Sequence, residues 1–202
     1  FGSQGQHGTM RSVEAWDYGT GDMSFIGCTV DTGVDLNHPD LQANLVSGYN
    51  SADRVTQSNG GSVGDINGHG TMTLGCVGAI GNNGVGVVGM AWNISLMPVR
   101  CTNSSGGGAY LSDLTDGARW AADNGARAIS VSYSGGESSS VESTGSYIRS
   151  QNGLMSWAAG NGGNRVYGSD HANAIMVGAT NQSDNRVSWS TYGDWVDVVA
   201  PG

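Results

Sequence analysis

Six short apolar segments, separated by helical or polar stretches, most constrain what this sequence can fold into. Most of them are continuously apolar rather than alternating, which is typical of strands that are covered on both faces of a sheet. They span residues 25–30, 94–99, 128–131, 154–159, 174–177 and 195–199. Because helical stretches lie between some of them, the pattern predicts an α/β fold with a mostly parallel central sheet and helices on both faces.

Two helices are expected between these strands. The first begins at Ser112, whose hydroxyl is a suitable N-cap, continues through apolar residues at helical spacing to Ala121, and ends at Gly125. The second covers residues 70–80, where small residues allow close packing. In a parallel sheet, functional sites collect at the carboxyl ends of the strands, so candidate residues are sought there.

The remaining long stretches, near 102–109 and 134–145, are rich in Ser and Gly and are expected to be loops. Neither is long enough to link two domains. The 202 residues are therefore expected to form one domain, residues 1–202, with a sizeable core.

The chain is acidic, with 17 Asp and Glu against 8 Arg and no Lys, and a net charge of −9. This balance argues against binding of nucleic acid or of an anionic membrane, and it suits a hard cation such as calcium. No run of 18 apolar residues predicts a membrane span. The first residues lack the basic start and apolar core of a signal peptide, which is expected to be absent or already removed.

Three cysteines, Cys28, Cys76 and Cys101, leave two interpretations open. One is a disulfide with one free thiol, and the other is three buried thiols.

Three residues in apolar or glycine-rich segments are candidates for a role in catalysis. Asp31 ends an apolar strand, where a carboxylate needs partners and could orient an imidazole. His69 lies between two glycines at the start of a helix, which leaves its ring open to act as a general base. Asn161 follows another apolar strand and could donate a hydrogen bond to a developing oxyanion. Taken singly, each also fits an ordinary turn or packing role.

Five motifs occur in order along essentially the whole chain: IGCTVDTGVDLNHPDL, GHGT, SVSYSGG, AAGNGG and VDVVAPG. In this order and spacing, the sequence resembles the subtilisin family of serine proteases. The resemblance implies that Asp31 orients His69, that His69 takes the proton from a serine hydroxyl, and that Asn161 stabilises the oxyanion. The implied fold is a subtilisin-like α/β domain that lacks its C-terminal part.

The resemblance also implies a cleft for an extended peptide or protein substrate, whose backbone would pair with two flanking segments. A third segment would line the pocket for the residue before the scissile bond, with a fairly open, apolar preference. These substrate-binding residues are Gly106, Gly107, Gly108, Ser132, Tyr133, Ser134, Ala158, Ala159 and Gly160.

A structural calcium site is implied as well. Asp40 of the HPDL segment would be its carboxylate ligand, Asn83 would add a side-chain ligand, and Val85 and Val87 would add carbonyl oxygens. Gln4 or Gln6 could complete the shell.

The sequence departs from the family at its end, because the GTSMA segment that holds the nucleophile in the family does not occur before Gly202. The expected function is a secreted serine endopeptidase with its serine outside this chain and with a propeptide during maturation. The serine would lie on a complementary C-terminal chain, on a cleaved segment, or on further C-terminal sequence. The alternative is a catalytically inactive relative that binds peptides or partners. Two smaller departures are Met72, in place of the second histidine of the family's HGTH box, and Trp157, in a strand of small residues.

Overall fold

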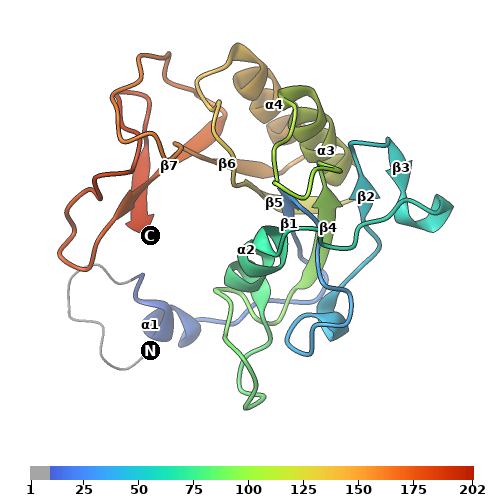
Figure 1. The fold of residues 1–202 in the computed structure, drawn as a ribbon. Helices are drawn as coiled ribbons and strands as arrows, with labels where there is room; N and C mark the ends of the chain where they lie inside the picture. Colours follow the sequence, from blue (N-terminus) through green and yellow to red (C-terminus); the bar gives the residue numbers. More distant parts are fainter. Residues whose placement is uncertain (1–9) are drawn as a thin grey trace.

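A computed structural model of the chain describes residues 10–202. These residues form an eight-stranded sheet in the order β3-β2-β4-β1-β5-β6-β7-β8, in which only the β2–β3 pair is antiparallel (Figure 1). The strands are β1 Ile26–Asp31, β2 Tyr49–Asn50, β3 Val55–Thr56, β4 Ser95–Arg100, β5 Ala126–Val131, β6 Leu154–Ala158, β7 Ala174–Thr180 and β8 Val198–Pro201. The predicted fold class, a mostly parallel α/β sheet, is confirmed.

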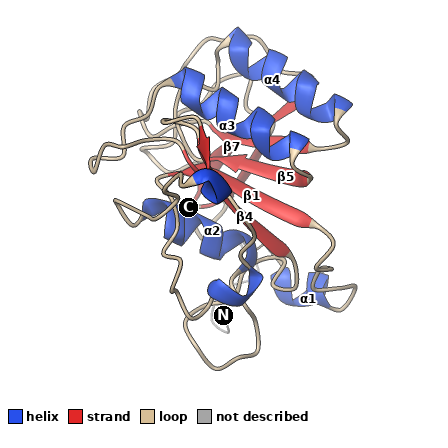
Figure 2. Ribbon diagram, turned by 90° about the vertical axis from the view of Figure 1, so that its right-hand side faces the viewer, coloured by secondary structure: helices blue, strands red, loops and turns tan. Residues whose placement is uncertain are grey.

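Helices cover both faces of the sheet. Helices α3 and α4 lie side by side on one face, and α2 lies on the other (Figure 2). The helices are α1 Ser12–Trp16, α2 His69–Gly78, α3 Leu111–Asp123 and α4 Ser139–Ser150, with short 3-10 turns at Gln42–Asn44 and Gln57–Asn59. No helix among the described residues is long and apolar enough to cross a membrane.

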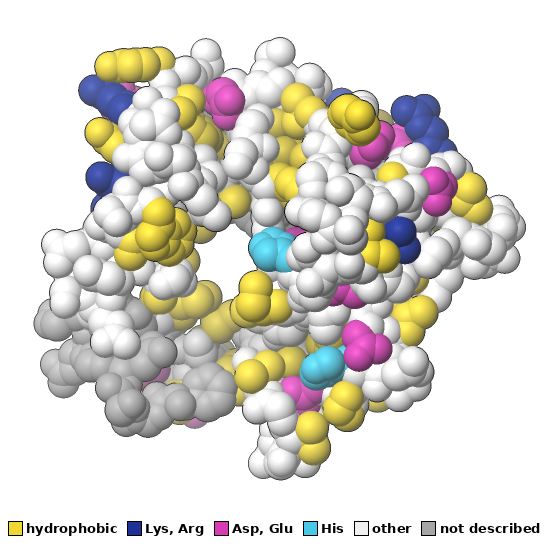
Figure 3. All heavy atoms as spheres, in the orientation of Figure 1, with side chains coloured by type: hydrophobic (Ala, Val, Ile, Leu, Met, Phe, Trp, Pro, Cys, Tyr) yellow, Lys and Arg dark blue, Asp and Glu magenta, His cyan; other side chains and the backbone are white. Residues whose placement is uncertain are grey.

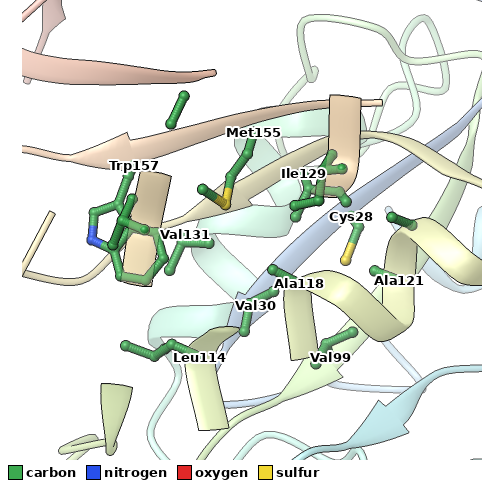
Figure 4. Close-up of a cluster of buried hydrophobic side chains, with 14 of the residues drawn as sticks. Cys28, Val30, Val99, Leu114, Ala118, Ala121, Ile129, Val131, Met155 and Trp157 are labelled. Carbon is green, nitrogen blue, oxygen red and sulfur yellow. The ribbon is translucent and has the colours of Figure 1, made fainter. Parts of the chain in front are cut away.

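Each face of the sheet has its own apolar core. The larger core joins β1, β4, β5 and β6 to α3 and α4, and Figure 4 shows side chains of these strands pointing toward Leu114, Ala118 and Ala121 of α3. The smaller core is centred on Leu74 of α2, which packs with Leu96 of β4. Strands β1 and β4 are buried almost throughout, so their continuous apolar sequence reflects packing on two faces, as expected.

The ends of several elements differ from the sequence prediction. Ser112 is not an N-cap, because α3 already begins at Leu111, with Tyr110 as its extended N-cap residue. Gly125 follows α3 with a φ of 96°, so the predicted stop is correct. The stretch 134–145 is not all loop, since α4 begins at Ser139 and Ser138 caps it by accepting a hydrogen bond from the Ser140 amide.

The last strand is shorter than predicted. It begins at Val198 rather than at residue 195, because Trp195 turns into the larger core, where it is fully buried. Strand β8 is an edge strand, and Val198 and Val199 are 49% and 57% exposed. This edge is therefore apolar and open among the described residues.

All three cysteines are free thiols. Cys28 and Cys101 are buried and Cys76 is exposed on α2, so neither interpretation of the cysteines is correct. Burial raises the pKa of Cys101 to about 12 and raises that of Cys28 further still, which keeps both thiols protonated.

Candidate active site

Asp31 lies at the carboxyl end of β1, between the ends of β4 and β5. The chain order reverses here, because it passes from β1 to the β2–β4 side of the sheet and then returns to β5 on the other side. Parallel sheets open a crevice at such a switch point, which is where ligands bind. Figure 3 shows a hollow in one face of the molecule, with a histidine side chain at its edge.

Asp31 and His69 form a hydrogen-bonded pair. His69 Nδ1 lies 2.8 Å from Asp31 Oδ1, and because a carboxylate only accepts, the proton belongs on Nδ1. Asp31 is 1% exposed, whereas the His69 side chain is 41% exposed. The second ring nitrogen, Nε2, therefore carries the lone pair on the open side of the ring, as a general base requires.

Several neighbours satisfy the buried Asp31 and hold it still. Its carboxylate accepts hydrogen bonds from the Thr32 amide (2.7 Å) and from the Thr73 hydroxyl (3.1 Å). Its carbonyl accepts from the Cys101 amide and from the Cys101 thiol. Thr73 follows His69 by four residues on α2, so both side chains lie on the helix face that meets Asp31.

Asp65 holds the amino-terminal end of α2, and sequence reasoning missed it. Its Oδ1 accepts from the amides of Asn67 and Gly68 and from the Thr32 hydroxyl, and its Oδ2 accepts from the amide and hydroxyl of Thr71. These bonds satisfy amides that a helix start leaves free, and they place a negative charge at the positive end of the helix dipole. The only sequence signal is Asp-x-Asn-Gly before a helix, which is typical of an Asx turn.

The pKa of Asp65 is well below its ordinary value. Burial alone raises this pKa, but the hydrogen bonds from the Thr71 side chain and from the Gly68, Asn67 and Thr71 amides lower it by more. Asp65 is therefore charged at neutral pH, and its bonds to Thr32 and Thr71 tie the end of β1 to the helix that carries His69.

The three predicted substrate segments lie next to one another. Tyr133 donates a hydrogen bond from its hydroxyl to the Gly107 carbonyl (2.7 Å), which joins segment 106–108 to segment 132–134. Gly160 lies against Ser134, because a Cβ built on Gly160 would lie 3.3 Å from the Ser134 hydroxyl. Asn67 donates to the Ser105 carbonyl, which links the same wall to the loop before His69.

Asn161 directly follows Gly160 in this wall. Its side chain is exposed and has no hydrogen-bond partner among residues 10–202, so its amide is available to a ligand. It follows β6, as predicted, and so lies at the same edge of the sheet as Asp31.

The predicted calcium ligands also come together, apart from Gln4 and Gln6, which lie outside the described residues. Asp40 is fully buried, and its carboxylate accepts from the Asn83 amide nitrogen and from the Val87 amide, each at 2.7 Å. Gly86 has a φ of 55° and lies against the Asp40 carboxylate. No cluster of three or more His, Cys, Asp or Glu that could hold a metal occurs in the described part of the chain.

The two departures noted in the sequence have different environments. Met72 is 61% exposed on α2 and is not a core residue. Trp157 is 1% exposed in the larger core, and its Nε1 has no acceptor among residues 10–202. Most buried polar groups have a hydrogen-bond partner, so this N–H is an exception among the described residues.

Comparison with known proteins identifies the family to which this site belongs. The model of the subtilase family matches residues 24–202, which include both members of the Asp31–His69 pair. The chain belongs to the subtilase family. Among subtilases, thermitase from Thermoactinomyces vulgaris is 38% identical over 196 residues, 96% of this chain and 68% of thermitase. The thermophilic serine proteinase of Bacillus sp. (strain AK1) is also 38% identical, over 93% of this chain and 46% of that protein.

Solved structures of subtilisin-like proteases have the same fold. A protease from Pseudoalteromonas arctica PAMC 21717 matches 99% of this chain and 69% of its own, with a TM-score of 0.82 and 29% identity. A cold-adapted subtilisin-like serine proteinase matches 90% of this chain and 64% of its own, with a TM-score of 0.70. This subtilase chain therefore spans roughly half to two thirds of the lengths of its relatives.

Proposed function

We propose that this subtilase chain carries most of the active site of a serine endopeptidase, with the nucleophilic serine supplied by a residue outside these 202. The observation that carries the proposal is the hydrogen bond between buried Asp31 and exposed His69 at the switch point of the sheet. The relatives are named as proteases, and this supports the proposal.

The pair suits His69 for proton transfer. Asp31 fixes the tautomer with the proton on Nδ1, so Nε2 can take the proton from a serine hydroxyl and return it to the leaving amine. When the imidazolium forms, the buried carboxylate stabilises its charge without taking the proton itself. The remaining bonds to Asp31 keep the carboxylate from turning away from the ring.

The wall formed by segments 106–108, 132–134 and 158–160 would bind the substrate backbone as an extended strand. Asn161, at the end of this wall, would donate its free amide to the oxyanion of the tetrahedral intermediate. Preorganised donors of this kind act in the transition state and so raise kcat rather than substrate affinity.

A calcium ion at Asp40 is part of the proposal. The residue types suit a hard cation, because Asp40 has a buried carboxylate and the nearby loop carries the Asn83 amide and the Val85 and Val87 carbonyls. In the structure the Asn83 nitrogen and the Val87 N–H both donate to Asp40, and the Asn83 oxygen accepts from the Val85 amide. This loop would therefore have to turn its oxygens inward to bind the ion. Such an ion would link the segment after β1 to the loop after α2.

The alternative is a subtilase that has lost catalysis and keeps the cleft for binding. Secretion, and a propeptide that assists maturation, also belong to the proposal, since the protease relatives include thermitase and subtilisins. A separate chain that carries the serine is one source of the nucleophile that the proposal allows, and an intact-mass measurement of the purified protein tests it.

A fluorophosphonate probe tests the function. Labelling of the complete protein at a serine outside residues 1–202, and its loss in His69→Ala, are the expected results, because a serine hydroxyl needs its general base to react. His38→Ala is the matched control, since it removes a histidine outside the Asp31 pair. If full-length protein of verified mass is folded and takes no label, the protein is an inactive relative.

A further inference from the structure

The loop that carries Asn161 needs an external support. Asn161 is flanked by Gly160, with a φ of 97°, and by Gly162 and Gly163, with a φ of 68° at Gly163. Glycine allows many backbone conformations, so the sequence alone does not hold this loop in one of them. An amide that must meet a developing oxyanion has to be held within a fraction of an ångström.

Thr191 contacts the chain on both sides of Asn161. The Thr191 amide donates to the Gly160 carbonyl (2.9 Å), and the Thr191 hydroxyl accepts from the Gly162 amide (3.0 Å). These two bonds fix the residue before and the residue after Asn161, while the Asn161 side chain itself is left free. Thr191 is 5% exposed, so water does not readily replace the hydroxyl.

Thr191 is itself anchored to the sheet. The Ser190 hydroxyl donates to the Thr191 carbonyl and accepts from the Ala179 amide of β7. The Arg186 guanidinium donates to the Ser190 carbonyl (2.7 Å). The support for the Asn161 loop therefore comes from β7 and the segment that follows it, not from the flexible loop.

We propose that Thr191 is a positioning residue that aims the Asn161 amide at the oxyanion. The proposal rests on the proposed endopeptidase function, because it assigns Asn161 the oxyanion role. Thr191 touches neither substrate nor the reacting atoms, and it acts only through the backbone on the two sides of Asn161.

Two variants of the complete protein separate this role from a packing role. Thr191→Val keeps the shape and the backbone donor and removes only the acceptor for the Gly162 amide. It should lower kcat about tenfold to a hundredfold and change KM by less than about twofold, since loss of an oxyanion donor lowers kcat about 10²- to 10³-fold. Thr191→Ser keeps a hydroxyl at this position and should have near wild-type kcat. Equal thermal unfolding temperatures would verify that Thr191→Val is folded.

A double-mutant cycle with Asn161→Ala makes the test specific. If Thr191 acts through Asn161, Thr191→Val should lower kcat no further in the Asn161→Ala background. Wild-type kcat in Thr191→Val, or an equal loss of kcat in both backgrounds, would overturn the proposal.

Deamidation gives a readout that needs no activity. The Gly162 nitrogen can attack the Asn161 side-chain carbon, forming a succinimide and expelling ammonia, and water then opens the ring to aspartate or isoaspartate. Because the Gly162 N–H is held by Thr191, release of this amide in Thr191→Val should speed deamidation of Asn161 severalfold by mass spectrometry. Asn59–Gly60, where the Gly60 amide donates to Gln57, is the internal control and should not change.

The two readouts keep the proposals apart. If even wild-type protein is inactive, the proposed endopeptidase function fails. Faster deamidation at Asn161 in Thr191→Val would still support the inference that the Thr191 hydroxyl holds the Asn161 loop. An unchanged ratio of deamidation at Asn161 to that at Asn59 shows that the Thr191 hydroxyl does not hold the loop and overturns the inference.

Discussion

Two buried tryptophans offer a matched test of how this core is stabilised. Trp157 and Trp195 are 1% and 0% exposed, and both lie against Gly136 in the same core. The Trp195 Nε1 donates to the Val166 carbonyl at 2.9 Å, whereas the Trp157 Nε1 has no acceptor among residues 10–202. Replacing either tryptophan with Phe removes a similar part of the ring. Loss of the unpaired Trp157 N–H should stabilise the fold, whereas loss of the hydrogen-bonded Trp195 N–H should destabilise it.

The expected free energies follow from this difference. The smaller ring loses about 2 kcal/mol of apolar burial in either variant. Trp157→Phe also removes a buried, unpaired donor that costs about 2 kcal/mol, so its stability should stay within about 1 kcal/mol of wild type. Trp195→Phe instead loses a hydrogen bond worth about 1 kcal/mol and should destabilise the fold by about 3 kcal/mol.

Equilibrium urea unfolding, followed by fluorescence and circular dichroism, measures both values. The m-value should be unchanged, so that a shift in the midpoint reports stability. If Trp157→Phe is as destabilising as Trp195→Phe, the Trp157 N–H has a partner such as a buried water, and the reasoning is refuted.

Four further outcomes are expected. Asp65→Asn should lower the free energy of unfolding at pH 7. This loss should shrink in urea titrations as the pH falls below about 4, because the Asp65 carboxyl takes up its proton in the unfolded state before it does so in the folded state. A loss that stays constant with pH contradicts this. Excess chelator should lower the melting temperature by about 5–10 °C if calcium is present at about 100 times its Kd, and Asp40→Asn should abolish the shift. Cys76 alone should react with a thiol reagent in the folded chain, with the two buried thiols reacting only after unfolding, and three fast thiols would contradict the burial. Residues 1–202 alone should self-associate through the exposed β8 edge, and Val198→Lys should reduce this association in light scattering; an unchanged signal would show that the edge is not the contact.

The strands of the sheet could be predicted where each is a local apolar run. The ends of β1, β4 and β6 lie within a residue or two of the predicted ends. Strands β2 and β3 were missed, since each has only two residues. Strand β2 depends on pairing with β4, which is distant in the sequence, and β3 pairs with β2. Helix α4 was missed because its Ser-rich sequence is typical of a loop, and its Ser138 cap and buried Val141 and Ile148 become visible only in the folded chain.

The candidate catalytic residues and the residues that hold them differ in how far they could be predicted. Asp31, His69 and Asn161 stand in motifs, so sequence order alone brought them to attention. Asp65 and Thr191 form hydrogen bonds to backbone groups, which carry little sequence signal, and the only signal for Asp65 is the Asp-x-Asn-Gly turn pattern.

This division has a physical reason. Each of the three catalytic candidates lies within two residues of a glycine with a positive φ, and glycine gives the backbone freedom but no rigidity of its own. Rigidity is then supplied from outside, by Asp65 for the start of α2 and by Thr191 for the Asn161 loop. Substitutions at these two supports should therefore lower kcat while leaving the substrate wall at Tyr133 and Gly107 intact, since that wall has its own hydrogen bond.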